Sequence, residues 1–229
     1  MKAFVGTSGW FYDWNKDRNL DWFLANSGLN TVELNASFYR FPFKNHVNAW
    51  ARKGNVLRWA IKVHRFITHV HKFNEQALET LESMHDLFKP LDKNIDFFLF
   101  QVPPYMKPEM ADKIADFYKS SRLKQRFAIE FRNKEWFTDE WYEWAKKLGL
   151  TLVSVDAPLL PRFIFNSNGF VYLRMHGRLL WYSHNYSDTQ LKEIRRKIML
   201  AKPRSIYVYF NNNHNMLRNA QAMMRILKK

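Results

Sequence analysis

Eight short runs of β-branched, aromatic and aliphatic residues, each ending in polar residues, recur along this 229-residue chain. Runs of this length and composition predict buried strands. Helical patterns separate most of them, and this alternation of strand and helix is the feature that most limits the fold. The runs are residues 2–7, 30–38, 58–64, 96–102, 126–131, 150–156, 170–176 and 205–211.

Strand and helix that alternate about eight times predict an all-parallel sheet closed on itself, a TIM-type α/β barrel. An open doubly wound sheet is the alternative, but strands that are apolar almost throughout favour closure. Pro158 and Pro161 lie between the sixth and seventh runs, so we expect a somewhat irregular barrel whose sixth crossover helix is short or missing. We expect residues 1–229 to form a single domain.

Two helices carry recognisable end signals. Thr138 is placed to cap the start of a helix, and Gly149 is placed to end it. Ser187 and Gln190 have the spacing of a capping box ahead of another helix.

In barrels of this kind the reactive residues lie at the C-terminal ends of the strands. Three carboxylates and three cations occupy such positions here: Glu33, Glu130 and Asp156 with Lys62, Arg132 and Arg174. Burying an unpaired charge is costly, so we expect these opposite charges to meet at one rim. A salt-bridge layer that only closes the barrel is the alternative interpretation of the same residues.

The residue types at the strand ends suit acid–base chemistry, and the catalytic candidates are Glu33, Lys62, Glu130, Asp156 and His176. Glu33 or Glu130 is the candidate base and His176 the candidate acid or base, with Lys62 as an electrostatic stabiliser. Lys62 is also a candidate for a Schiff base. The sequence pattern leaves these roles open.

Hydroxyl, amide, aromatic and guanidinium side chains near the strand ends are predicted to bind the substrate. They are Thr7, Ser8, Trp10, Asn35, Tyr39, Gln101, Arg132, Arg174, Arg178, Tyr209, Asn211 and Asn212. In this fold the loops after the seventh and eighth strands often bind phosphate, which suggests an anion-binding role for Arg178, Asn211 and Asn212. The stretch GTSGW at residues 6–10 lacks the lysine of a P-loop and the third glycine of a dinucleotide fingerprint, so no nucleotide cofactor is expected.

A divalent metal is a further candidate, because Glu33, Glu130, Asp156 and His176 are residue types that ligate one. Such a metal would activate water for phosphodiester cleavage. Three cations compete for the same carboxylates, and histidines at the strand ends are few. We therefore assign no metal site from the sequence and leave the cofactor open.

Charge points to an anionic partner. Lys and Arg number 36 against 21 Asp and Glu, a net charge of +15, and residues 190–229 contain ten basic residues and one acidic residue. Such a field concentrates polyanions, so the expected partner is DNA, RNA or a phosphorylated small molecule.

Several features of the sequence limit its class and location. It has no cysteine, which excludes disulfides and thiolate metal sites. It has no apolar stretch near the roughly 20 residues that cross a bilayer, and no signal-peptide pattern at its start. We expect a cytoplasmic protein that does not enter membranes.

Eight motifs occur in an order that resembles the YecE-like family, also called domain of unknown function 72, over essentially the whole chain. They are GTSGW (6–10), TVELNASFYRFP (31–42), ITH (67–69), LFQVPP (99–104), IEFRNKEW (129–136), VDAP (155–158), YLRMHG (172–177) and VYFNNN (208–213). The resemblance implies a TIM-type barrel and no established reaction. Asn213 and Asn215 stand where family members commonly have Asp and Gly, which weakens any metal site in that loop.

The sequence therefore predicts a barrel enzyme that acts on a phosphate-containing substrate, with nucleic acid favoured, by hydrolytic or acid–base chemistry. Phosphodiester hydrolysis is the first reaction to consider. Two alternatives stay open: a small-molecule isomerase or lyase of the sugar-phosphate type, and a non-catalytic nucleic-acid-binding protein whose aromatic residues stack on bases.

Overall fold

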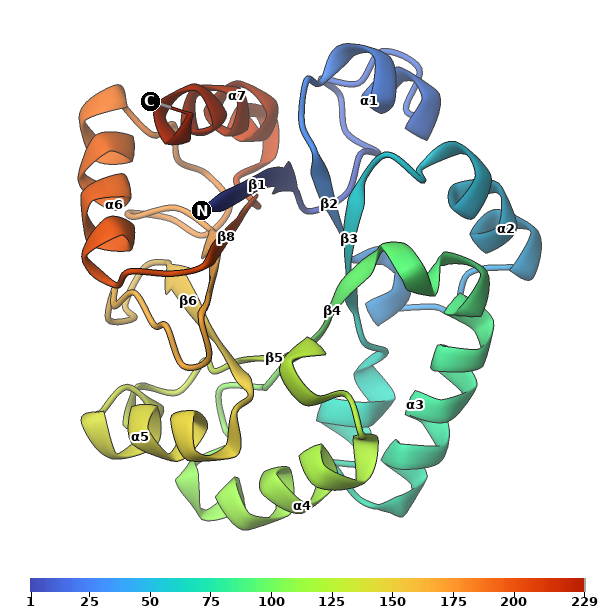
Figure 1. Ribbon diagram of the computed structural model, residues 1–229, viewed down its shortest axis with the longest axis vertical. Helices are drawn as coiled ribbons and strands as arrows, with labels where there is room; N and C mark the ends of the chain where they lie inside the picture. The colour runs from blue at the N-terminus through green and yellow to red at the C-terminus, as the bar shows by residue number, and fades with distance from the viewer. Residues whose placement is uncertain (229) are drawn as a thin grey trace.

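Eight parallel strands form a closed barrel in the computed structural model, which describes residues 1–228 (Figure 1). Each strand pairs with the next along the chain, and β8 pairs with β1, so the sheet has no free edge. This confirms the predicted TIM-type barrel and excludes the open sheet. The strands are β1 (Lys2–Thr7), β2 (Thr31–Leu34), β3 (Arg58–Lys62), β4 (Ile95–Gln101), β5 (Phe127–Glu130), β6 (Thr151–Asp156), β7 (Phe170–Met175) and β8 (Ser205–Phe210).

Seven α-helices within the described residues surround the strands (Figure 1). They are α1 (Leu20–Asn26), α2 (Lys44–Lys53), α3 (Glu75–Phe88), α4 (Ala111–Ser121), α5 (Asp139–Leu148), α6 (Asp188–Leu200) and α7 (Met216–Leu227). Short 3-10 turns and a π-helical turn at Phe66–Val70 lie between the main elements. None of the helices in residues 1–228 combines the length and apolar content needed to cross a membrane.

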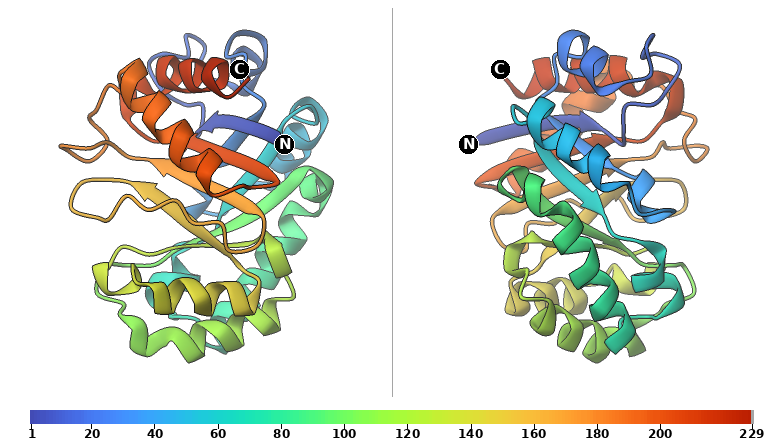
Figure 2. Two further views of the ribbon diagram at one scale, coloured as in Figure 1. Left: turned by 60° about the vertical axis from the view of Figure 1, so that its left-hand side comes forward. Right: turned by 90° about the vertical axis from the view of Figure 1, so that its right-hand side faces the viewer.

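The sixth crossover, residues 157–169, contains no helix, as predicted from its two prolines. Side chains of β6 and of the loop accept hydrogen bonds from each other's backbone instead. Ser154 Oγ accepts a hydrogen bond from the Phe165 amide (2.8 Å), and Ser167 Oγ accepts one from the Leu152 amide (3.0 Å). Figure 2 shows this loop and the next one, coloured yellow to orange, reaching outward at one end of the barrel.

The helix ends follow the sequence signals with one exception. Both hydrogen bonds of the capping box between Ser187 and Gln190 are present at the start of α6. Gly149 ends α5 with φ of 78°, a left-handed conformation that glycine adopts without a steric penalty. Thr138 is the N-cap residue of α5, as predicted, but its side chain makes no capping hydrogen bond.

Aromatic side chains pack in the N-terminal part of the barrel. Phe97 packs edge-on against Tyr207 and Tyr172, with ring centroids 4.8 and 5.2 Å apart, and Phe4 stacks on Tyr207 at 4.6 Å. Tyr209 is fully buried among them, next to Tyr172 at 5.0 Å. These rings leave the C-terminal end of the barrel to the polar and charged residues.

The basic segment predicted to attract polyanions forms α6, β8 and α7. Its exposed cations, such as Lys192 and Arg196 on α6 and Arg225 on α7, project from the outer helical layer. The excess charge of this segment is therefore spread over the outside of the barrel and not gathered at the strand ends.

We expect Gly6→Ala to destabilise the protein by about 1–3 kcal/mol or more, because an added Cβ would lie 2.1 Å from the carbonyl oxygen of Thr31. This contact is backbone of the neighbouring strand β2, which cannot move without opening the β1–β2 pair. Gly28→Ala is the matched control, since its Cβ would meet nothing within 4 Å and only its φ of +65° opposes the change. Urea denaturation of both variants checks the prediction, and an equal or smaller loss for Gly6→Ala would contradict it.

Candidate active site at the barrel mouth

A buried arginine joins two buried glutamates at the C-terminal end of the barrel. Glu33 on β2, Glu130 on β5 and Arg174 on β7 are each at most 1% exposed. Arg174 Nη2 donates to Glu33 Oε1 (2.7 Å), and Nη1 donates to Glu130 Oε2 (2.6 Å). The predicted meeting of opposite charges from separate strands is thus present for these three residues.

Glu33 accepts further hydrogen bonds from both sides. Ser8 Oγ donates to its Oε1 at 2.8 Å, and the Tyr172 hydroxyl donates to its Oε2 at 2.7 Å. Asn35 Oδ1 accepts a longer bond of 3.4 Å from Arg174. Because both oxygens of Glu33 are engaged deep in the barrel, this carboxylate is not placed to accept a substrate proton.

Glu130 is held in its ionised form. Its Oε1 accepts a hydrogen bond from Arg132 Nε, and its Oε2 lies 3.6 Å from His176 Nε2. Burial alone raises the pKa of Glu130, but the charges of Arg132 and Arg174 outweigh burial and hold the pKa well below its ordinary value. Glu130 is therefore not favoured as the catalytic base.

His176 is also unsuited to proton transfer near neutral pH. Burial lowers the pKa of His176 to about 3, and the neighbouring Arg132 acts in the same direction. Its Nε2 lies 3.1 Å from Arg132 Nη2, and its buried Nδ1 has no hydrogen-bond partner among the described residues. The neutral imidazole thus orients Arg132.

Lys62, another of the predicted catalytic residues, has a pKa near neutrality. Burial lowers the pKa of Lys62 to about 7, and Arg174 acts in the same direction while Glu130 opposes it. Its Nζ donates to Gln101 Oε1 at 2.8 Å and lies 4.0 Å from the centre of the Phe38 ring. Within residues 1–228 no carboxylate lies within 4.0 Å of this ammonium group.

A cavity of about 400 Å³ opens beside this cluster between the loops that follow β4, β5, β6 and β7. Gln101, Arg132 and Lys134 supply polar groups, and Trp181 and Tyr182 supply aromatic groups. Pro104, Pro158, Leu159 and Leu160 complete the wall. Gln101 connects the cavity to Lys62, whose amine lies one hydrogen bond behind the cavity wall.

Asp156 does not join the central cluster, contrary to the prediction. Its Oδ1 accepts a hydrogen bond from the Tyr186 hydroxyl (3.0 Å), and its Oδ2 lies 3.3 Å from Arg178 Nε. Ser154, two residues earlier on the same face of β6, bonds to the crossover loop outside the barrel. Since alternate residues of a strand face opposite ways, Asp156 also faces outward.

Arg178 and Asn212 have structural partners and do not form the predicted phosphate site. Arg178 lies between Asp156 and Glu193, which neutralise its charge. The Asn212 side-chain amide donates to the His184 carbonyl (2.6 Å) and to Asn219 Oδ1 (2.8 Å), which ties the β7–α6 loop to α7. Asn211 follows β8 and is half-buried.

Four other predicted substrate-binding residues lie away from the cavity or below it. Thr7 is buried, and its hydroxyl donates to the Gly9 carbonyl (2.7 Å) within the GTSGW turn. Trp10 packs edge-on against Trp59, 5.7 Å away, on the outer side of the sheet. Tyr209 is 0% exposed and bonds to Thr31 Oγ1 inside the barrel, whereas Tyr39 is 73% exposed on the rim.

The four candidate metal ligands do not gather. In residues 1–228 no three side chains of His, Asp or Glu come close enough to share an ion. The guanidinium of Arg174 occupies the space between Glu33 and Glu130 where a cation would have to lie, and Asp156 faces away. The Arg174 guanidinium therefore takes the position between the two glutamates that a metal ion would need.

Sequence reasoning missed three residues of the site. Tyr172 lies two residues before Arg174 on the same strand face, so its contact with Glu33 could have been inferred from the period of the strand. Lys134 and Trp181 lie in irregular loops, where no period relates sequence position to direction.

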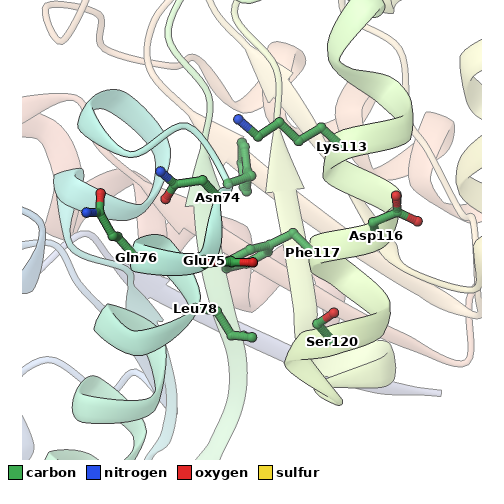
Figure 3. A pocket seen from close by; sticks show the side chains of 9 residues that line it. Asn74, Glu75, Gln76, Leu78, Lys113, Asp116, Phe117 and Ser120 are labelled. Carbon is green, nitrogen blue, oxygen red and sulfur yellow. The ribbon is translucent and has the colours of Figure 1, made fainter.

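A larger hollow lies outside the barrel between α3 and α4 (Figure 3). It has a volume of about 740 Å³ and is lined by side chains such as Asn74, Glu75, Lys113 and Asp116, with Phe117 at its base. None of the residues singled out by the sequence lines it. Its position on the helical layer separates it from the strand ends, where barrel enzymes hold their reactive groups.

Comparison with known proteins gives the family of this chain and its fold. Residues 4–229 match the family described as "Protein of unknown function DUF72". The UPF0759 protein YunF of Bacillus subtilis is 24% identical over 234 aligned residues, which cover 86% of this chain and 82% of that protein. The crystal structure of a DUF72 family protein of Thermotoga maritima has a TM-score of 0.88 at 25% identity, with 100% of each chain covered. A DUF72 family protein of Enterococcus faecalis gives 0.85 at 20% identity, covering 99% of this chain and 96% of that one.

We expect Arg174→Met to destabilise the protein by about 3–5 kcal/mol at pH 7, because it strands two buried carboxylates without their shared cation. The loss should shrink below about pH 4.5, since the stranded carboxyl groups become neutral there. In the wild-type protein the low pKa of Glu130 contributes stability above the ordinary glutamate pKa, and this stability is lost as the pH falls through the lower folded-state value. Denaturant titrations between pH 3.5 and 7.5 test this. Arg18→Met, which breaks an exposed pair, is the control and should cost less than about 1 kcal/mol.

Proposed function

Because the chain belongs to the DUF72 family, whose description assigns no activity, we propose its function from the geometry of the barrel mouth. The protein is an enzyme that binds a small phosphate-containing substrate in the mouth cavity and moves protons through Lys62. An isomerase or lyase of the sugar-phosphate type fits such a site. One observation carries the proposal: a buried lysine without a carboxylate partner adjoins a cavity that presents further cations.

The amine of Lys62 has the properties that acid–base catalysis requires. With a pKa of about 7, it is present in both protonation states at neutral pH. The pKa values of Glu130 and His176 lie far below neutrality, which makes both residues weak bases. Proton transfer by Lys62 is therefore favoured over hydrolysis by a pair of carboxylates.

Two cations on the cavity wall suit a phosphate group. Lys134 is exposed, and Arg132 is half-buried beside it. Arg132 uses Nε toward Glu130 and Nη2 toward His176, while Nη1 makes no hydrogen bond to another described residue. A guanidinium fixed in this way presents its free edge without an ordering cost when an anion binds.

The size and walls of the cavity favour a small molecule. A volume of about 400 Å³ lies within the range of small-molecule sites. Pro158, Leu160 and Trp181 form an apolar wall that excludes water from one side of the substrate. Such exclusion strengthens the attraction between a phosphate and the cations opposite.

We expect Lys134→Met to weaken the binding of ribose 5-phosphate roughly tenfold, because it removes one charge-assisted contact to the phosphate. Lys113→Met is the matched control, since Lys113 is an exposed lysine of the outer groove (Figure 3) and should not affect affinity. Isothermal titration calorimetry measures both affinities. Equal affinities for the two variants would contradict a phosphate-binding site at the mouth.

Exposed aromatic side chains on the rim support a second candidate, the binding of single-stranded nucleic acid. Phe11, Tyr39 and Tyr105 lie in the loops after β1, β2 and β4 and are 69%, 73% and 60% exposed. Cations accompany two of them: Arg18 lies 5.8 Å from the Phe11 ring centre, and Lys72 lies 5.5 Å from that of Tyr105. Alternation of aromatic rings and cations is the pattern by which proteins stack bases and bind phosphates.

If the rim binds nucleic acid, Tyr105→Ala should weaken binding of an oligodeoxythymidylate about 5- to 100-fold, the range for one stacked base. The logarithm of the affinity should also fall linearly with the logarithm of salt concentration. Fluorescence anisotropy at several salt concentrations measures both effects. Val56→Ala, an exposed apolar position outside the mouth loops, is the control, and a flat salt dependence would exclude this candidate.

A further inference from the structure

We propose that Lys62 is a covalent nucleophile that forms an imine with the carbonyl group of an aldehyde or ketone substrate. The inference rests on the proposed function, because it takes the mouth cavity as the substrate site. It goes beyond proton transfer in naming the functional group of the substrate and the bond that forms.

The contacts of Lys62 leave its nitrogen free to react. Gln101 Oε1 accepts one N–H at 2.8 Å, and the Phe38 ring lies 4.0 Å from Nζ. Neither neighbour takes the nitrogen lone pair, as a hydrogen-bond donor would. The backbone is fixed as well, because Ser37 Oγ donates to the Lys62 carbonyl at 2.6 Å.

The charges around Lys62 favour a neutral amine. Arg174 and Arg132 both disfavour the ammonium form, and the carboxylate of Glu130, which would stabilise it, is already bonded to both arginines. Desolvation beside cationic groups is the means by which imine-forming lysines are activated. The ion-paired cluster at the centre of the barrel therefore has a chemical consequence for the lysine next to it.

Other side chains of the mouth do not compete for this role. The described chain has no cysteine, and the Ser8 hydroxyl is buried and donates to Glu33. Lys134 lies on the same cavity but is exposed to solvent, so it lacks the burial that distinguishes Lys62. Lys62 is thus the buried amine of the mouth: it is 8% exposed and lies one hydrogen bond from Gln101, which lines the cavity.

The reaction balances without an added oxidant or reductant. The Lys62 nitrogen attacks the carbonyl carbon, and the C–O π electrons move to oxygen to give a carbinolamine. The C–O bond then breaks, and the oxygen leaves as water with the two protons that the amine carried. The product is a C=N bond, which can withdraw electrons from an adjacent C–C or C–H bond that breaks in a lyase or isomerase reaction.

Reductive trapping tests the inference on the wild-type protein. The protein is incubated at pH 7 with glycolaldehyde phosphate and sodium cyanoborohydride, and peptide mass spectrometry then locates each modified lysine. We expect Lys62 to be modified more than tenfold faster than Lys72, an exposed lysine of the loop after the same strand. The physical reason is that about half of an amine with a pKa near 7 is neutral at this pH, against fewer than about one in a thousand for an ordinary lysine.

Matched variants and probes separate the possible failures. Lys62→Met should abolish the fast modification, and Lys113→Met, at an exposed position of α4, should leave it intact. Wild-type mapping alone decides the case if Lys62→Met does not fold. Modification confined to exposed lysines would overturn the inference, and if ribose 5-phosphate still bound through Lys134, the proposed function would stand without it. Equal rates at Lys62 with glycolaldehyde and its phosphate would support the imine and contradict the phosphate site.

Discussion

Buried charges must be paired, and this requirement determines how side chains are arranged at the C-terminal end of the barrel. The closed sheet keeps water from Glu33 and Glu130, and an isolated carboxylate there would cost several kcal/mol. Arg174 satisfies both with one planar guanidinium, because its separate nitrogens reach carboxylates on different strands. The positions of β2, β5 and β7 are thereby linked through three side chains, and the groups around them are arranged to suit this pairing.

Lys62 is the exception to the pairing, and the proposed chemistry depends on this exception. Burial lowers the pKa of Lys62, and the two arginines that neutralise the glutamates act in the same direction, while Glu130 and Glu33 oppose it. A salt-bridge layer that only closed the barrel would not require a buried lysine whose neighbours are the Gln101 amide and the Phe38 ring. The structural and the proposed catalytic interpretation of the charged ring are therefore compatible, since the arginines of the ion pairs also lie near the amine.

The charges of this protein act on anions in two ways: the net charge attracts them to the whole molecule, and the cations of the mouth line a single cavity. The net charge of +15 raises the concentration of anions around the whole molecule. Under the proposed function, selection among those anions depends on the mouth, where Arg132 and Lys134 adjoin an apolar wall. The overall charge of the sequence thus predicts a general attraction of anions. Under the proposed function, the geometry of a few side chains determines which anion binds.

The sequence by itself determined the barrel and its irregular sixth crossover. It also predicted that Glu33, Glu130 and Arg174 meet at the strand ends. These follow from local patterns: the alternation of strand and helix, the prolines of residues 158 and 161, and charges placed at the ends of apolar strands. Only the tertiary structure decided which way Asp156 faces, that Arg178 is neutralised by Glu193, and that Lys134 and Trp181 share a cavity. The physical reason is that the face and register of a strand and the path of a loop depend on packing between segments far apart in the chain, which no local pattern specifies.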